Sequence, residues 1–421
     1  MLCLVILCGG KGTRLKNVIR SKSKTLVKIN RKELLTHILD QFKNIKNKYF
    51  LVNKNQHDVV NYLNKKNYSK NILIENSYLG DGGCLSSLKK IENFHLHNFL
   101  VVSGDLLINA DISKFVNFHN KHKSKLTLWC HPTDHAKDSD LLKYDNKYKL
   151  TNFFKKPHKK NNIGNISATG IYLINGDLLK YLPKKLDNYP SRNFFKRLNN
   201  KKISIYCYNS RDFIKDAGTP YRLKYLRKLI KKERFQLSNT INKMGAIFLD
   251  RDGVVNKENN NKKFPSPMDM FQGTFRAIKR INNSKYLCII ITNQSAVAKG
   301  FLTEKKLNQL HDKFKMTLSK NNCYVDEIYY CPHHPHKGFK GEIKKYKKIC
   351  GCRKPKVGLF KKAIGNFNID IKRSIFIGNS YTDYLAAKKL KIKYFHIGRK
   401  NIIGQKLKSF SNLNKVLNKV I

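Results

Sequence analysis

The stretch Ala246-Ile247-Phe248-Leu249-Asp250-Arg251-Asp252-Gly253 joins a short apolar run to two carboxylates placed two residues apart, with a glycine directly after them. An uninterrupted apolar run of this kind is typical of a buried strand in a parallel sheet. Because ligands bind at the carboxyl ends of the strands in such sheets, we expect both acids to enter one crevice from a rigid support. Taken alone, the pattern also fits a strand that ends in an ordinary turn, where Asp and Gly are common.

The rest of the chain alternates apolar runs of strand length with helix-like segments, and this alternation predicts an α/β fold. A chain of 421 residues is longer than one hydrophobic core usually supports, so we expect two domains. We place them at residues 1–232 and 244–421, with a linker over 233–243, and expect in each a mainly parallel, Rossmann-like sheet covered by helices. The expected strands are Leu2–Leu7, Tyr49–Val52, Asn71–Ile74, Phe99–Val102, Leu126–Trp129, Ala246–Leu249, Leu287–Ile291 and Ser374–Ile377, and the expected helices include Leu34–Phe42, Val59–Leu63 and a segment capped by Thr303.

The chain is strongly basic, with 85 Lys and Arg against 28 Asp and Glu and a formal net charge of +57. Such a charge suits nucleic acid, an anionic membrane surface or small phosphorylated substrates. The lysines are scattered over almost every segment, without a basic tail or an aromatic-basic repeat. We therefore expect phosphorylated small molecules as partners, with no specific nucleic acid and no membrane. A nucleic acid-binding protein is the rival interpretation, and it predicts tight, steeply salt-dependent binding to arbitrary DNA or RNA.

The apolar start, Met1 to Cys8, has no basic region before it and no small-residue cleavage site after it, so we interpret it as a first core strand rather than a signal peptide. No run of about 18 apolar residues occurs in the sequence. We expect a cytoplasmic protein, in which the ten cysteines serve packing or metal binding rather than disulfides. The sequence gives no indication of the oligomeric state.

The two carboxylates suit phosphoryl transfer. Asp250 can attack phosphorus to form an aspartyl-phosphate, while Asp252 protonates the departing oxygen and later activates water. Because the two acids are crowded together, we expect Asp252 to be protonated more often than a free Asp.

Three further motifs follow in order: the strand Cys288–Asn293 ending in a hydroxyl and an amide, then Lys354, then the segment Ser374–Asp383. Together these motifs resemble the haloacid dehalogenase-like phosphatases over the whole C-terminal domain, and the resemblance implies dependence on Mg²⁺. It also implies that Thr292 and Lys354 hold phosphoryl oxygens, that Asn293 and Arg353 contact the substrate, and that Mg²⁺ is bound by Asp250, Asp252, Asn379 and Asp383.

Asn379 departs from the family pattern, which has an Asp close to the metal at this position. Hard cations favour charged oxygen ligands, so the lost charge is expected to weaken Mg²⁺ binding, with Asp383 as the residue that compensates.

Two cysteine-containing motifs, Cys331-Pro332-His333 and Cys350-Gly351-Cys352, flank a lysine-rich loop. Three thiolates and one imidazole form a closed tetrahedral Zn²⁺ set, which is structural because no coordination position is left for water. His334 and His336 are possible substitutes for His333, and ordinary buried cysteines are the alternative to a metal site. Since Arg353 and Lys354 follow the last thiolate directly, a zinc site would also fix the backbone that presents these two cations.

Within this family, the segment Asn293–Gly300 and the run Cys-Arg-Lys-Pro at 352–355 are similar to those of the heptose 1,7-bisphosphate phosphatases, from Gly245 to about Gly398. Histidinol-phosphate phosphatases are relatives with a comparable metal loop. The substrate therefore stays open at this point.

The first expected strand is followed by Cys8-Gly9-Gly10-Lys11-Gly12-Thr13-Arg14-Leu15. Three glycines allow backbone amides to approach an anion, and Lys11 and Arg14 add positive charge, so the loop suits a triphosphate. The spacing matches neither a Walker loop nor a Rossmann fingerprint, and a plain glycine-rich turn is the alternative.

Later motifs support the prediction of a nucleotide site: Lys24, the second glycine cluster Gly80–Gly83, the strand end at Asp105, Phe154–Pro157 and Phe213–Pro220. In this order they resemble the sugar-1-phosphate nucleotidyltransferases over about Met1 to Lys228, and among these the heptose 1-phosphate guanylyltransferases. The resemblance implies Mg²⁺ on Asp105 and Asp216, a nucleoside triphosphate, most simply GTP, and a sugar phosphate. The residues that it assigns to these ligands are Gly9, Gly10, Gly12, Thr13, Arg14 and Lys24 for the nucleotide phosphates, Gly82 for the base and Lys156 for the sugar phosphate.

Several positions in this domain depart from the family pattern, namely Ser23, Thr25, Lys155 and Ala168-Thr169. A non-catalytic binding module is therefore an alternative. If both domains are active, they perform consecutive steps: removal of the 7-phosphate from a heptose bisphosphate and nucleotidyl transfer to the remaining 1-phosphate.

Overall fold

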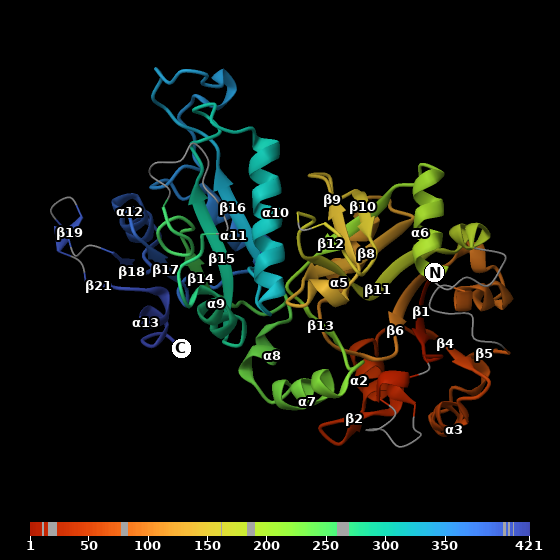
Figure 1. The fold of residues 1–421 in the computed structure, drawn as a ribbon. Helices are drawn as coiled ribbons and strands as arrows, with labels where there is room; N and C mark the ends of the chain where they lie inside the picture. Colours follow the sequence, from red (N-terminus) through yellow and green to blue (C-terminus); the bar gives the residue numbers. More distant parts are fainter. Residues whose placement is uncertain are drawn as a thin grey trace. The chain divides into compact units, whose positions relative to one another are not determined.

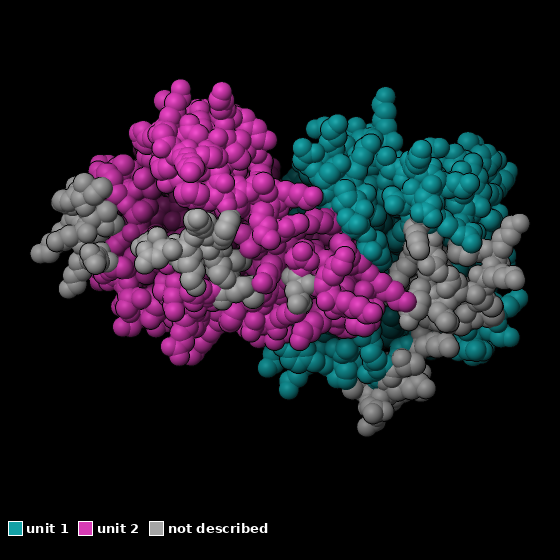
Figure 2. Space-filling view, turned by 45° about the horizontal axis from the view of Figure 1, so that its top comes forward, with its two compact units in different colours: residues 1–131, 144–153, 168–239 teal, residues 132–143, 154–167, 240–421 magenta. Residues whose placement is uncertain are grey.

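The chain forms two units in the computed structural model, which describes residues 1–10, 12–15, 23–76, 83–160, 162–182, 190–258, 269–398, 401–402, 405–406 and 408–421 (Figure 1). Unit 1 contains residues 1–131, 144–153 and 168–239, and unit 2 contains residues 132–143, 154–167 and 240–421 (Figure 2). The predicted boundaries at 232 and 244 rest on the sequence alone and stay a prediction. The predicted linker begins with a short helix, α8 (Glu233–Leu237), whose Phe235 is buried.

The first sheet has nine strands and mixes parallel with antiparallel pairs. Its central strand β1 (Leu2–Leu7) runs parallel to both β4 (Asn47–Asn53) and β6 (Asn98–Ser103). The strand β11 (Ile166–Asn175) pairs antiparallel with β6 on the other side. The remaining strands of this sheet are β5 (Ile72–Glu75), β8 (Leu126–Pro132), β9 (Leu141–Tyr144), β10 (Leu150–Phe154) and β12 (Ile205–Asn209).

Buried aliphatic and aromatic side chains from these strands and their helices, among them Ile6, Val102, Phe115 and Trp129, form the core of unit 1. The helices are α2 (Leu34–Gln41), α3 (His57–Lys65), α5 (Ile112–Lys121), α6 (Pro190–Asn200) and α7 (Pro220–Leu229). Two small ladders complete the unit: β2 (Lys28–Ile29) with β3 (Lys32–Glu33), and β7 (Leu106–Asn109) with β13 (Phe213–Asp216).

The sheet of unit 2 has six strands in the order β16-β15-β14-β17-β18-β21, and every pair in it is parallel. The strands are β14 (Gly245–Leu249), β15 (Tyr286–Asn293), β16 (Glu327–Cys331), β17 (Ile375–Gly378), β18 (Lys393–Ile397) and β21 (Ser409–Phe410). The helices are α9 (Thr274–Asn282), α10 (Glu304–Lys320), α11 (Gly358–Phe367), α12 (Tyr381–Leu390) and α13 (Leu413–Leu417), and a separate hairpin pairs β19 (Asn401–Ile402) with β20 (Gln405–Lys406). The predicted α/β class with two sheets is thereby confirmed.

Local signals explain where several of these elements begin. The Thr303 hydroxyl accepts a hydrogen bond from the Lys306 amide and begins α10, as its sequence predicts. Ser380 and Asp383 form a reciprocal capping box at the start of α12. Strand β14, whose five residues are all buried, lies between β15 and β17, so the chain segments that follow these three strands share one edge of the sheet.

A search of the described ranges for a helix both long enough and apolar enough to cross a bilayer found none.

Candidate active sites

Asp250 lies at the carboxyl end of β14 and is 9% exposed. Its amide donates a hydrogen bond to the Ile377 carbonyl on the neighbouring strand at 3.0 Å, which fixes the backbone of the acid. The ammonium of Lys354 lies 2.8 Å from an Asp250 oxygen, 2.7 Å from Asp383 Oδ1 and 2.9 Å from the Ile291 carbonyl. One buried cation therefore joins Ile291 of β15 to the acids that follow β14 and β17, as the predicted phosphatase motifs require.

The electrostatics of this group favour an incoming cation. Burial raises the pKa of Asp250 to about 7, Lys354 opposes this shift, and the nearby carboxylates of Asp383 and Asp252 add to it. Burial works against the charged form of Lys354, but Asp250 and Asp383 outweigh it and raise the pKa of the ammonium. Among the described residues, Asp250, Asp252 and Asp383 have Lys354 and Arg251 as their close cations, so negative charge is in excess there.

Asp252 corrects one expectation from the sequence. Burial alone would raise the pKa of this acid, but the Arg251 guanidinium and hydrogen bonds from Asn256 and Gln294 outweigh burial and lower it. Arg251 contacts both Asp252 oxygens at 3.0 Å. The prediction that crowding keeps Asp252 protonated was therefore wrong for this arrangement. The nearby Arg251 guanidinium lowers the pKa of Asp252 by more than burial raises it.

Thr292 and Asn293 end β15, and both predicted side chains have defined partners. Thr292 is 1% exposed, and its hydroxyl accepts a hydrogen bond from Gln294 Nε2 at 2.9 Å. Asn293 exchanges two hydrogen bonds with the backbone of Lys354: its Oδ1 accepts from the Lys354 amide at 3.0 Å, and its Nδ2 donates to the Lys354 carbonyl at 3.2 Å. Asn293 thus holds the loop that delivers Lys354, and its contact with substrate stays a prediction.

Asn379 and Asp383, the two predicted metal residues after β17, differ in their surroundings. One Asp383 oxygen accepts from the backbone amides of Asn379 and Ser380, at 3.2 and 3.1 Å, while the other faces Lys354. The Asn379 side chain donates to Glu258 Oε1 at 3.0 Å, so a carboxylate that the sequence did not single out stands beside the neutral residue. A side chain at Gly253, where φ is +80°, would overlap the Asn379 amide, which explains the glycine after Asp252.

Cys331, His333, Cys350 and Cys352 come together, with ligand atoms all within 4.8 Å of one another. The separations are 3.1 Å for Cys331–Cys352, 3.2 Å for Cys350–Cys352, 3.6 Å for Cys331–Cys350, and 3.2 and 3.7 Å from His333 Nδ1 to Cys352 and Cys331. One tetrahedral ion with metal–ligand bonds of about 2.0–2.3 Å needs ligand separations of about 3.3–3.8 Å. The separations here, 3.1–3.7 Å, come within about 0.2 Å of that range, so small adjustments would let the group hold such an ion.

His333, rather than His334 or His336, belongs to this group, since the His334 ring nitrogen instead faces the His336 carbonyl at 3.3 Å. A hydrogen bond connects this group with the segment that carries Arg353 and Lys354: Arg353 Nη1 donates to the His333 carbonyl at 3.2 Å.

In unit 1, the predicted metal acids occupy neighbouring backbone positions. Asp216 ends β13 opposite Leu106, the residue after Asp105, and the Ala217 amide donates to the Asp105 carbonyl at 2.8 Å. The Lys24 ammonium contacts Asp105 Oδ2 at 2.6 Å. Both Asp216 oxygens accept from Arg222 Nη1 at 2.8 Å, and Arg222 is a partner that sequence reasoning missed.

The glycine loop of unit 1 lies against the same residues. A side chain at Gly10 would overlap Lys24, and a Cβ at Gly218 would lie 3.4 Å from the Arg14 guanidinium. The structure therefore brings Gly10, Arg14, Lys24, Asp105 and Asp216 together. Gly9 adjoins the buried Glu75, a Cβ there being 3.6 Å from Oε2, and Gly12 adopts a positive φ of +60°.

That group does not include every residue predicted for this site. Lys156 lies in the segment 154–167 that is counted with unit 2, where its ammonium contacts the Asp138 carboxylate at 3.3 Å. Gly82 and the Thr13 side chain lie outside the described residues, as does Lys11.

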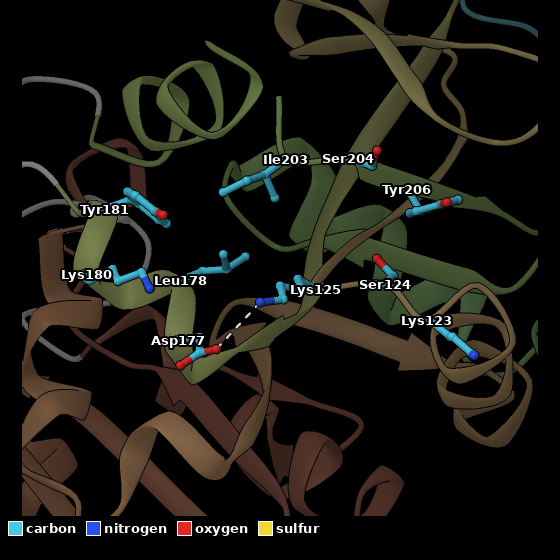
Figure 3. Close-up of a pocket in the computed structure, with 10 residues that line it drawn as sticks. All are labelled: Lys123, Ser124, Lys125, Asp177, Leu178, Lys180, Tyr181, Ile203, Ser204 and Tyr206. Atoms are coloured by element: carbon cyan, nitrogen blue, oxygen red, sulfur yellow. Dashed lines mark ion pairs between the residues drawn. The ribbon is translucent and has the colours of Figure 1, made fainter. Parts of the chain in front are cut away.

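Unit 1 also has a pocket of about 440 Å³ at the beginnings of β8 and β12 (Figure 3). In Figure 3 Lys125 points toward Asp177, and the two are 3.6 Å apart. Among the described residues, none that is predicted to bind nucleotide or sugar phosphate lines this pocket, whereas the glycine loop and Asp105 follow the ends of β1 and β6. The pocket is therefore separate from the candidate nucleotide site.

Sequence reasoning also missed Arg251, Gln294 and His311 of unit 2. Arg251 was visible between the two acids, and Gln294 directly follows the predicted Asn293. His311 gave no signal, because it lies on α10, 60 residues after Arg251, and only the fold brings its ring within 3.0 Å of the guanidinium.

Two family models match the chain. Residues 4–228, more than half of the chain, match the nucleotidyl transferase family. Residues 246–396 match a family described as polynucleotide kinase 3 phosphatase.

Individual relatives are similar to one part of the chain each. The D-glycero-beta-D-manno-heptose-1,7-bisphosphate 7-phosphatase of Haemophilus ducreyi is 36% identical over 149 residues, which are 35% of this chain and 79% of that protein. The D-glycero-alpha-D-manno-heptose-1,7-bisphosphate 7-phosphatase of Campylobacter jejuni is 34% identical over 180 residues, 42% of this chain and 95% of that protein. The crystal structure of HddC from Yersinia pseudotuberculosis complexed with GMP-PN covers 55% of this chain and 100% of its own, with a TM-score of 0.45 and 22% identity.

Proposed function

Because the chain belongs to the nucleotidyl transferase family over residues 4–228 and, in its C-terminal part, to the D-glycero-D-manno-heptose-1,7-bisphosphate 7-phosphatases, we propose that it catalyses two consecutive steps on one sugar. Unit 2 removes the 7-phosphate of a D-glycero-D-manno-heptose 1,7-bisphosphate. Unit 1 then transfers a nucleotidyl group to the 1-phosphate that remains. The observation that carries the first step is the buried Asp250–Lys354–Asp383 group at the carboxyl edge of the unit 2 sheet.

In the phosphatase step, Asp250 Oδ attacks the 7-phosphorus and forms an aspartyl-phosphate, while the bond between phosphorus and the sugar oxygen breaks. That oxygen takes a proton from Asp252. Asp252 then removes a proton from water, which cleaves the aspartyl-phosphate and releases inorganic phosphate. Thr292 and Lys354 hold the phosphoryl oxygens, with Lys354 as the charged member.

Asp252 must carry a proton when the sugar oxygen leaves, although Arg251 favours its ionised form in the substrate-free arrangement. A phosphate dianion beside Asp252 disfavours the carboxylate and raises its pKa. Asp252 therefore takes up its proton as the substrate binds.

Mg²⁺ suits the excess of negative charge around Asp250, and its ligands would come from the predicted residues Asp250, Asp252, Asn379 and Asp383, with Asp383 also orienting Lys354. Because the Asp252 carboxyl carries the proton, Asp252 would offer its backbone carbonyl oxygen. When bound, the ion neutralises charge on the phosphoryl group. The Cys331–His333–Cys350–Cys352 group suits a structural Zn²⁺, because three thiols and one imidazole complete a tetrahedral set. Zn²⁺ would secure the Arg353 loop through the His333 carbonyl.

In the transferase step, an oxygen of the sugar 1-phosphate attacks the α-phosphorus of a nucleoside triphosphate and pyrophosphate leaves. The glycine loop, Arg14 and Lys24 hold the triphosphate, and Asp105 and Asp216 would hold a Mg²⁺ that offsets charge between the two anions. We propose GTP as the nucleotide and the cytoplasm as the compartment, as the sequence motifs and their resemblance predict.

A substrate panel tests both steps. The purified full-length chain is supplied with heptose 1,7-bisphosphate, other phosphosugars and histidinol phosphate, each with every nucleoside triphosphate in turn, while phosphate and pyrophosphate are measured separately. The proposal expects phosphate from the heptose bisphosphate and pyrophosphate only when GTP is present. Hydrolysis of histidinol phosphate in preference to every sugar bisphosphate would replace the first step. Phosphate release without pyrophosphate from any nucleotide would make unit 1 a binding module.

A further inference from the structure

We propose that Arg251, held by His311 and Gln294, is a positioning residue that clamps Asp252 in the orientation needed for proton transfer. This inference rests on the proposed role of Asp252 as proton donor. It gives a role to Arg251, Gln294 and His311, three buried residues that were not among the site residues predicted from the sequence.

The clamp is a connected set of hydrogen bonds. Arg251 Nε donates to Asp252 Oδ1 at 3.2 Å, and Nη2 lies 3.0 Å from each Asp252 oxygen. The same Nη2 donates to Gln294 Oε1 at 3.0 Å, and Gln294 Nε2 in turn donates to Asp252 Oδ2 at 2.8 Å. Gln294 Nε2 also reaches Thr292 Oγ1 at 2.9 Å, so the acid and the phosphate-binding hydroxyl share one partner.

His311 supplies the far end of the clamp. Arg251 Nη1 lies 3.0 Å from His311 Nε2. A guanidinium has only donors, so Nε2 must accept and the imidazole must be neutral, with its proton on Nδ1. Both residues are buried, Arg251 at 1% exposure and His311 at 5%, so water cannot easily replace either partner.

This geometry explains why a full positive charge is buried beside the catalytic acid. A planar guanidinium with partners on three sides cannot rotate, and its paired contacts fix the plane of the Asp252 carboxylate. Without His311, Arg251 Nη1 loses its acceptor inside the protein and the guanidinium must shift toward another one, taking Asp252 with it. The damage should therefore fall on proton transfer to the leaving oxygen rather than on attack by Asp250.

Leaving groups separate these two effects. A sugar alkoxide is a strong base and needs the proton from Asp252, whereas p-nitrophenolate is a weak base and departs without it. We compare the full-length chain with His311→Leu, which removes the acceptor, and with His311→Gln, whose amide oxygen can stand in for Nε2. Each protein is assayed for kcat and KM on heptose 1,7-bisphosphate, and for the rate of p-nitrophenol release in the first turnover of p-nitrophenyl phosphate. The first turnover is used because the later hydrolysis of the aspartyl-phosphate needs Asp252 with either substrate.

The clamp predicts that His311→Leu lowers kcat on the sugar phosphate by about 10- to 100-fold, within the range that general acid catalysis supplies, and changes the first-turnover rate of p-nitrophenol release by less than about 3-fold. KM on the sugar phosphate should change little, and His311→Gln should restore most of the lost kcat. Ser319→Ala is the matched control. Ser319 lies on the same helix as His311, and its hydroxyl accepts a buried hydrogen bond from the Ala136 amide at 2.8 Å. Loss of this bond should leave the substrate ratio unchanged.

Equal loss on both substrates, or full activity of His311→Leu on the sugar phosphate, would overturn the clamp. Asp252→Asn separates this failure from failure of the proposed function. If Asp252→Asn spares the first-turnover release of p-nitrophenol while His311→Leu shows no such preference, the clamp alone is wrong. If Asp252→Asn shows no leaving-group preference either, the assignment of Asp252 as acid falls, and the clamp falls with it.

Discussion

Replacing Lys354 with Met removes the cation that pairs with two buried carboxylates, Asp250 and Asp383. Its ammonium lies 2.8 Å from Asp250 and 2.7 Å from Asp383, and its side chain is 2% exposed. At an effective dielectric constant of about 20, each contact is worth about 6 kcal/mol of gross attraction, most of which offsets the cost of burying the charges. Breaking a buried pair leaves the partner charges uncompensated, so we expect the Lys354→Met variant of unit 2 to lose about 3–5 kcal/mol of unfolding free energy.

The pH dependence of this loss has a definite sign. The folded pKa of Asp250, about 7, already lies above its ordinary value, so stability falls as the pH rises through the interval between them. Lys354 lowers that folded pKa, so its removal raises the upper end of the interval and stability continues to fall to higher pH. The difference between Lys354→Met and the unmodified protein should therefore be larger at pH 8.5 than at pH 6.

The assay is urea unfolding without added Mg²⁺ at both pH values, monitored with a spectroscopic probe placed in unit 2. Phosphatase activity is measured in parallel. Lys315→Met is the matched control: Lys315 pairs with Glu327 at 2.7 Å, but Glu327 is 26% exposed and can be solvated, so a loss of about 1 kcal/mol or less is expected. A Lys354→Met protein that is as stable as the control at pH 8.5, or that retains phosphatase activity, would refute the role given to Lys354.

Three further outcomes follow from the same contacts. Cys352→Ser should lose the bound metal, measured by elemental analysis, and lower phosphatase activity because the His333 carbonyl no longer holds Arg353; a metal-free protein with full activity would contradict the link. Asn379→Asp should lower the Mg²⁺ concentration for half-maximal activity, since a charged ligand replaces a neutral one, and an unchanged titration would place Asn379 outside the metal shell. Burial lowers the pKa of His119 to about 4, so the unfolded state takes up a proton first on acidification; unit 1 should lose up to about 3 kcal/mol between pH 6.5 and pH 4, and His119→Asn should flatten this dependence in pH-resolved denaturation.

The catalytic edge of unit 2 could be predicted because its strands are short, uninterrupted apolar runs and its chemical groups follow them directly. Asp250 follows β14 and Thr292 lies at the end of β15, so the rule for parallel sheets was sufficient to bring them to one edge. The metal-ligand group was predictable for a similar reason, because paired ligands such as Cys350 and Cys352 mark themselves in sequence.

Other features depend on side-chain directions that no local pattern contains. The low pKa of Asp252 follows from the way Arg251 folds back onto it, and periodicity does not encode that rotamer. His311 and Glu258 became visible only as neighbours in space. In unit 1, the antiparallel strand β11 beside β6 was not among the expected strands, because Ala168, Thr169 and Gly170 interrupt its apolar pattern.

The order of the two steps tests the central claim most directly. The full-length chain and its Asp250→Asn variant are each incubated with GTP and either heptose 1,7-bisphosphate or heptose 1-phosphate, and pyrophosphate release is followed. We predict that the unmodified chain releases pyrophosphate from GTP with either sugar, whereas Asp250→Asn releases it only when heptose 1-phosphate is supplied. Two results would contradict the proposed order of reactions. One is pyrophosphate release by the Asp250→Asn variant when heptose 1,7-bisphosphate is supplied, and the other is no release by the unmodified chain with either sugar.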